Sequence, residues 1–192
     1  MVTVRTIARL AASVIVLVGA LMLGYVGMVF VDAFQYQAEY HASLPAAPAS
    51  MTSRLEIPAP LIEGAAIGEI HIARLGLSEV IGQGESAEVL RRGVGHLADT
   101  AWLGERGNVV LAGHRDTVFR SLRDIQPGDR IDVLAAHALV HYEVQSTIVV
   151  SPATLSVLEP SEGNTLTLIT CFPFGFIGAA PERFIVRARE IR

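Results

Sequence analysis

The segment Thr165–Cys171 reads Thr-Leu-Thr-Leu-Ile-Thr-Cys, and its alternation predicts a β-strand that ends at a thiol. Neighbouring side chains of a strand face opposite ways, so Leu166 and Leu168 share an apolar face while Cys171 lies on the more polar one. The following loop, Phe172–Gly178, is rich in aromatic residues and is expected to shape an apolar groove beside the thiol. The alternative is that Cys171 fills the core, as free cysteines usually do.

Six further short strands are predicted around this segment, with turns that contain Gly or Pro between them. The helical patterns are brief: one begins at Ser86, a residue suited to capping a helix, and another covers Thr117–Asp124 before the turn Gln126–Asp129. Strands of this length and spacing predict a closed or nearly closed β-barrel, and no β-α-β rhythm supports a doubly wound sheet. The six strands are expected at Ile67–Ile72, Leu77–Ile81, Asn108–Gly113, Arg130–Leu134, Val140–Val150 and Phe184–Ala188.

The amino terminus carries a run of 22 residues without a charge, Leu10–Val31. A helix of this length spans about 33 Å, which matches a bilayer core of about 30 Å. Arg5 and Arg9 precede the run and Asp32 follows it, so the excess of positive charge predicts a cytoplasmic amino terminus and an extracytoplasmic remainder. A cleaved signal peptide is the alternative, but its apolar core would be shorter.

These features divide the chain into four parts. Residues 1–9 form a cytoplasmic amino terminus and residues 10–31 a transmembrane anchor. Residues 32–66 form a juxtamembrane segment, expected to begin as a short helix, followed by a linker in which Pro and Ala are frequent. Residues 67–192 are expected to form the folded domain, which carries the candidate reactive residues described below.

Charge and cysteine content exclude several classes of function. All 15 basic residues are Arg; two lie in the first 31 residues, which leaves 13 against 19 acidic residues, a formal balance of −6. An acidic domain is a poor partner for nucleic acid, which is bound through dense basic surfaces. One cysteine allows no disulfide within the chain, and scattered histidines do not make a zinc pattern.

Two other residues have the chemistry that a nucleophilic thiol requires. His114 follows the predicted strand Asn108–Gly113, where an imidazole can accept and return a proton; His96 is a rival. Arg183 begins the last strand, where a guanidinium can stabilise an oxyanion. Taken singly, His114 also fits a loop histidine bonded to the backbone, and Arg183 fits a solvated charge.

Three strings together resemble the sortase family, in particular class D sortases. They are Thr167–Cys171, the run Leu111–Thr117 with His-Arg-Asp-Thr after the glycine, and Ala180–Phe184. The resemblance extends from about Ile67 to Ala188 and includes the Cys-Phe-Pro-Phe sequence that begins at the thiol.

This resemblance implies an eight-stranded β-barrel with short helices and a transpeptidase activity. Cys171 would attack a Thr carbonyl in an LPXTG-like sorting signal, His114 would act as general acid and then base, and Arg183 would bind the substrate backbone and oxyanion. Thr170 is expected to add a hydrogen-bond donor beside the thiol. Supporting or substrate-binding roles are expected for Asp116, Phe172 and Phe174.

The resemblance implies no organic cofactor. Calcium, which some sortases bind, is not expected, because the segment Ser151–Asn164 holds only Glu159 and Glu162 as acids and calcium takes six or more oxygen ligands. The implied partners are secreted proteins with a C-terminal LPXTG-like signal and an amine acceptor on the cell wall or a pilin. Two alternatives stay open: a thiol peptidase that transfers the acyl group to water, and a tethered binding module with a vestigial site.

Overall fold

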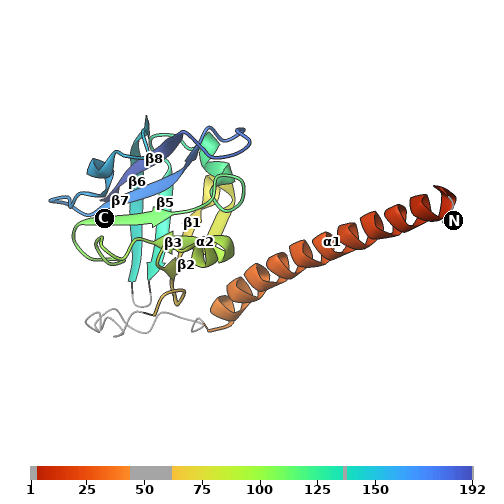
Figure 1. The fold of residues 1–192 in the computed structure, drawn as a ribbon. Coiled ribbons are helices and arrows are strands. Elements are labelled where there is room, and N and C mark those ends of the chain that lie inside the picture. The colour runs from red at the N-terminus through yellow and green to blue at the C-terminus, as the bar shows by residue number, and fades with distance from the viewer. Residues whose placement is uncertain (1–3, 44–61, 136–137, 192) are drawn as a thin grey trace.

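The computed structural model describes residues 4–43, 62–135 and 138–191. Within these ranges eight strands close into a barrel in the order β1-β2-β3-β4-β7-β8-β6-β5, and a long helix, α1, extends away from it (Figure 1). The expected mostly-β barrel is therefore confirmed. The strands are β1 (Ala66–Ile72), β2 (Leu77–Gln83), β3 (Val94–His96), β4 (Asn108–Ala112), β5 (Arg130–Ala135), β6 (Ala138–Val150), β7 (Thr165–Phe172) and β8 (Glu182–Ile191).

Two of the strand pairs are parallel, β2 with β3 and β4 with β7, and the other pairs are antiparallel. The alternation in β7 sets its two faces as expected. Leu166 and Leu168 are fully buried in the barrel core, opposite Ala188 and Val186 of β8, which are also buried. The residues that alternate with them, Thr167, Ile169 and Cys171, therefore lie on the outer face of the barrel.

The helical elements of the barrel domain are short, as expected. Ser86 caps α2 (Ala87–Arg92) by accepting a hydrogen bond from the Val89 N–H at 3.4 Å, which confirms the predicted helix start. The prediction of a helix over Thr117–Asp124 was wrong in its bounds and type. Only η2 (Arg120–Asp124) forms, and it is a 3-10 helix. Further 3-10 turns are η1 (Ala73–Leu75) and η3 (Leu155–Leu158).

The 3-10 geometry of η2 has a packing reason. Phe119 and Leu122, three positions apart, are both fully buried, and three residues per turn is the 3-10 period. A hydrogen-bonded turn follows η2, in which the Asp129 N–H donates to the Gln126 carbonyl at 3.1 Å. The chain then re-enters the barrel at β5.

Helix α1 (Val4–Ser43) is longer than the expected membrane span, because it continues through the juxtamembrane segment. Its apolar side chains up to Val31 are exposed except for the half-buried Val29, and the helix is long and apolar enough to cross a membrane. It is therefore a candidate transmembrane span. The proposed Pro-containing linker lies mostly in residues 44–61, outside the described residues.

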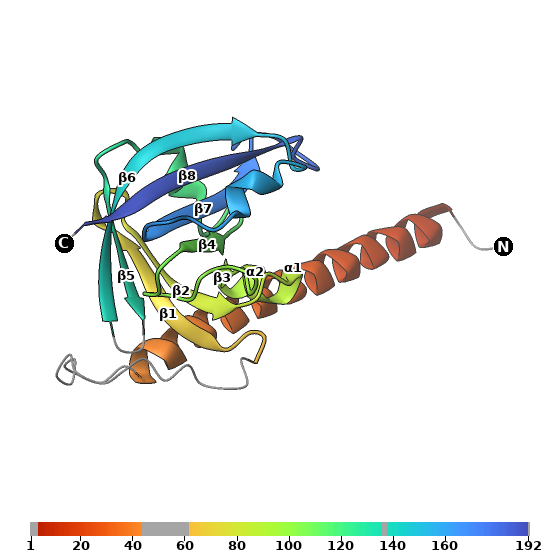
Figure 2. The ribbon, with the colours of Figure 1, turned by 90° about the vertical axis from the view of Figure 1, so that its left-hand side faces the viewer.

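The last turns of α1 pack on the barrel beside α2 (Figure 2). Asp32 forms an ion pair with Arg92 at 2.8 Å, and the Tyr36 hydroxyl donates to the Gly64 carbonyl at 3.2 Å. Gln37 Oε1 accepts from the Val80 N–H at 3.0 Å. Because β3 pairs only with residues 81–83 of β2, this amide supplies the partner that Val80 lacks in the sheet.

Glu79 lies at the same junction, where Gln37 Nε2 donates to its carboxylate at 3.1 Å. Burial, with a smaller contribution from the nearby Glu69 charge, raises the pKa of Glu79 to about 7. The interface between α1 and the barrel therefore contains a carboxyl that is protonated in part near neutral pH.

We expect Glu79→Gln to raise the melting temperature at pH 8 and to change it little at pH 5. The native pKa of about 7 lies above the ordinary value of 4.5, so the folded chain binds a proton that the unfolded chain has lost between these values. Stability contributed by Glu79 therefore falls as pH rises through this window, and a neutral amide removes the loss. Circular dichroism melts at both pH values measure the effect, with exposed Glu85→Gln as control; a lower melting temperature at pH 8 would contradict it.

Candidate active site

Cys171, near the end of β7, lies directly opposite Arg183 of β8. Directly opposed residues of an antiparallel pair point to the same face, with Cα atoms about 4.5–5.5 Å apart. This is the outer face of the barrel, because the alternate residues Leu166 and Leu168 fill the core. Cys171 is half-buried, so the thiol is not enclosed in the core as the alternative reading required.

His114 reaches the same end of the barrel by a different route. It follows β4, which runs parallel to β7 with Ala112 level with Ile169. The Gly113 N–H continues this pairing by donating to the Ile169 carbonyl at 3.1 Å. Because parallel strands end at the same edge of a sheet, the exposed His114 is level with Cys171. The structure thus gathers Cys171, His114 and Arg183, whose chemical roles stay predictions.

Thr170 has a different contact from the one expected. Its side chain is buried, and its hydroxyl donates to the Gly113 carbonyl at 2.7 Å. The proton that was expected to help stabilise an oxyanion is therefore already used. Instead, Thr170 fastens the end of β7 to the residue that precedes His114.

We expect Thr170→Val to destabilise the protein by about 1–3 kcal/mol, because the Gly113 carbonyl would lose its buried donor while the side-chain shape is kept. Urea unfolding measures the difference. Thr147→Val on β6, a half-buried threonine in the same type of strand, serves as the matched control. An equal effect of the two substitutions would show that the bond to Gly113 contributes nothing special.

Phe172 and Phe174, predicted to shape the site, form an aromatic cluster with Phe184. The centroid of the Phe174 ring lies 5.3 Å from that of Phe184 and 6.0 Å from that of Phe172. Both Phe174 and Phe184 also pack against the barrel core. Asp116 does not join them: it is exposed, and no contact of its side chain is found within the part of the chain that the structure describes.

Arg183 is half-buried and is held by its own turn. One guanidinium nitrogen, Nη1, donates to the carbonyls of Glu182 at 3.0 Å and Ala180 at 3.4 Å. Of the other two arginines on this face of β8, Arg187 donates to the Val157 carbonyl at 3.1 Å and Arg189 is exposed further along the strand. Arg183 is thus the arginine that lies beside the thiol.

Sequence reasoning missed Asn108, which holds the segment between β6 and β7. Asn108 is buried, accepts a hydrogen bond from the Thr167 hydroxyl at 2.6 Å, and donates to the carbonyls of Val157 at 3.1 Å and Glu159 at 3.0 Å. The segment with η3 is therefore fixed over the outer face of β7. The sequence around an asparagine at the start of a strand does not indicate which distant carbonyls its side chain will bind.

Arg115 was also missed. It is buried, and its guanidinium donates to the carbonyls of Pro173, Phe176 and Gly178 at 2.7–3.1 Å. The loop between Cys171 and Arg183 is therefore bound to the residue that follows His114.

His96, the rival proton carrier, has a structural setting. It is buried, with Nε2 2.9 Å from the Ala101 carbonyl and Nδ1 3.0 Å from Gln83 Oε1. Burial lowers the pKa of His96 and so favours the neutral ring. Both nitrogens are engaged away from solvent, which leaves His114 as the accessible imidazole at the site.

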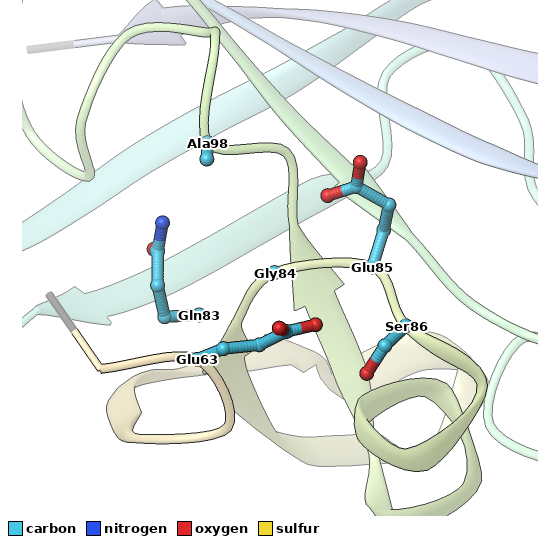
Figure 3. A pocket seen from close by; sticks show the side chains of 6 residues that line it. All are labelled: Glu63, Gln83, Gly84, Glu85, Ser86 and Ala98. Carbon is cyan, nitrogen blue, oxygen red and sulfur yellow. The ribbon is translucent and has the colours of Figure 1, made fainter.

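Two cavities lie away from this site. The larger, of about 430 Å³, is lined by residues that include Glu63, Gln83 and Glu85 near the start of α2 (Figure 3). The other, of about 330 Å³, lies between η1 and η2. Neither is lined by Cys171, His114 or Arg183, so the candidate site is formed on the outer surface of the barrel.

The arrangement suits acyl transfer. A thiol at a strand end can attack a carbonyl, an exposed imidazole level with it can exchange protons, and a guanidinium opposite it can stabilise negative charge.

Among the described residues, no group of three metal-ligating side chains is found.

Comparison with known proteins agrees with this geometry. A sequence model of the sortase domain matches residues 70–191, which is more than half of the chain. The chain belongs to the sortase family. Among curated sortases, Sortase D of Bacillus subtilis (strain 168) is 35% identical over 129 residues, which cover 67% of this chain and 65% of that protein. The chain therefore spans slightly less than two thirds of this relative.

Solved sortases share the barrel. A Sortase D5 transpeptidase of Clostridium perfringens superposes with a TM-score of 0.70 at 29% identity, over 84% of this chain and 99% of that one. Sortase E1 of Streptomyces coelicolor, with a tripeptide in its active site, gives a TM-score of 0.61 at 33% identity, over 67% of this chain and 90% of that one. The similarity to class D sortases expected from the sequence is thus present in both comparisons.

Proposed function

We propose that this sortase is a membrane-anchored cysteine transpeptidase. It cleaves an LPXTG-like sorting signal through a thioacyl-enzyme and transfers the acyl group to an amine. The observation that carries the proposal is the convergence of Cys171, His114 and Arg183, from three different strands, at one end of the outer face of the barrel. Family membership and the relative from Clostridium perfringens, described as a transpeptidase, support it.

The proposed reaction has two balanced halves. The Cys171 sulfur, as thiolate, adds to the carbonyl carbon of the Thr of the signal, and His114 gives a proton to the departing amine of the next residue as the peptide bond breaks. An acceptor amine then adds to the thioester and loses its proton to His114. The carbon–sulfur bond breaks, which restores the thiolate and leaves a new amide.

Arg183 acts on both tetrahedral intermediates. Its Nη1 already bonds the local carbonyls, and the remaining N–H groups of the guanidinium are available to the substrate oxygen. Phe172 and Phe174 form the apolar surface beside the thiol on which the signal peptide is bound.

The sequence of α1 supports the proposed location. With Arg5 and Arg9 before the apolar run, the catalytic barrel lies on the extracytoplasmic side, where secreted proteins present their signals. The acceptor is an amine on the cell wall or a pilin.

A fluorogenic LPXTG peptide, incubated with and without triglycine, tests this function. We expect cleavage and, with triglycine, a product of the mass of the new amide; mass spectrometry also detects the thioacyl-enzyme on Cys171. Cys171→Ala is expected to abolish all three signals. Cleavage with no amide at any triglycine concentration would favour the thiol peptidase. No cleavage of the peptide by folded protein would favour the binding module.

The two supporting residues are tested by separate substitutions. We expect His114→Ala to lower kcat/KM by about 10²–10⁴-fold, because it removes the proton carrier. Arg183→Ala is expected to lower it by about 10²–10³-fold, as for one oxyanion donor. His96→Gln serves as the comparison among histidines, with intact folding checked by circular dichroism; a larger loss of activity in folded His96→Gln than in His114→Ala would reverse their assignment.

A further inference from the structure

Arg115 is a buried charge without an acidic partner. It is 8% exposed, and over residues 4–43, 62–135 and 138–191 no carboxylate forms an ion pair with it. A buried charge is expensive unless hydrogen bonds replace its water. Here three backbone carbonyls do so: Pro173 at 3.1 Å from Nη1, and Phe176 at 2.7 Å and Gly178 at 2.9 Å from Nη2.

All three carbonyls belong to one loop, residues 173–181, which joins β7 to β8. Within the described chain, this loop makes one backbone hydrogen bond of its own, from the Phe176 N–H to the Pro173 carbonyl at 3.3 Å, and one bond to Arg183 through Ala180. Most of its remaining surface is exposed, including Ile177 at 97%. Arg115 therefore supplies more of the hydrogen bonds that order this loop than the loop itself does.

The position of Arg115 in the chain gives these bonds a second consequence. Arg115 directly follows His114, and the loop directly follows the Cys171 strand end and precedes Arg183. The guanidinium also lies 5.9 Å from the centroid of the Phe176 ring, in a cation–π arrangement. One side chain thus connects the backbone of the proposed proton carrier to the segment between the other two site residues.

We propose that Arg115 is a positioning residue: it holds the β7–β8 loop as a fixed wall of the site and sets the placement of His114 relative to Cys171. The proposal deepens the proposed transpeptidase function and rests on it. The fork geometry of the Arg115 guanidinium is essential, because two of its nitrogens donate to three carbonyls, an arrangement that a single lysine ammonium does not reproduce.

Arg115→Gln and Arg115→Lys test the proposal in the full chain. We expect both to lower kcat for the sorting peptide by about 10–100-fold, because a displacement of about 1 Å at reacting groups has this effect. KM is expected to change less than kcat, because Phe174 stays packed against the barrel core while the reacting groups are displaced. Hydrogen–deuterium exchange is expected to rise in residues 174–180 while β7 and β8 stay protected.

The matched control is Arg106→Gln. Arg106 is exposed and donates to one carbonyl, that of Glu162, so the same charge and one bond of the same kind are removed elsewhere. This variant is expected to keep the wild-type kcat and loop exchange. A stability role alone would lower the melting temperature of the Arg115 variants and leave kcat of the folded fraction unchanged.

A variant in the β7–β8 loop keeps the proposal testable if the Arg115 variants do not fold. Gly178 has φ of 105°, which alanine adopts only with strain, and it lies in an exposed turn away from the core. Gly178→Ala is expected to move the carbonyl off the guanidinium and to lower kcat in the same way. Combined with Arg115→Lys it should add little, because both changes break the same contact. Gly76→Ala is the control, because Gly76 has φ of 61° and open space around it, so alanine there introduces backbone strain away from the site.

The outcomes separate this proposal from the function on which it rests. Wild-type kcat in folded Arg115→Gln and Gly178→Ala, or unchanged exchange of the loop in either, would overturn the positioning role. If the wild-type protein cleaves no sorting peptide, the proposed function fails, and loop exchange still decides whether Arg115 holds the segment.

Discussion

The parallel pairing of β4 with β7 is the constraint on which the site depends. Parallel strands finish at one edge, so the residues after Ala112 and Ile169 meet although they lie more than fifty positions apart in the chain. The bond from Thr170 to Gly113 fixes this register at its last step. A slip by one residue would turn the thiol toward the core, so packing of Leu166 and Leu168 inside the barrel also keeps the sulfur outside.

Much of the fold could be predicted from local patterns. Alternation predicted the strand that ends at Cys171, short apolar runs between turns predicted six further strands, and Ser86 predicted the start of α2. The remaining strand, β3, has three residues, which are too few to show an alternation. An eighth strand was expected only from the family resemblance. The sequence predicted a helix over Thr117–Asp124, whereas the structure has a 3-10 helix over Arg120–Asp124 only, with the buried Phe119 and Leu122 three positions apart.

The candidate site was predictable where the chemistry lies in the side chain itself. A thiol, an imidazole and a guanidinium at strand ends are visible in a sequence. Asn108 and Arg115 were not, because their partners are backbone carbonyls 49–63 positions away, and every residue has a carbonyl. For the same reason Thr170 was given a role in the reaction: its neighbour in the sequence is Cys171, whereas its partner in space is Gly113.

The contacts of Asp32, Tyr36 and Gln37 hold the last turns of α1 against the barrel. Because α1 is one continuous helix from Val4 to Ser43, these contacts also set the direction in which its candidate membrane span leaves the barrel. Under the proposed function, they would thereby determine which side of the barrel, and so which side of the site, is turned toward the lipid.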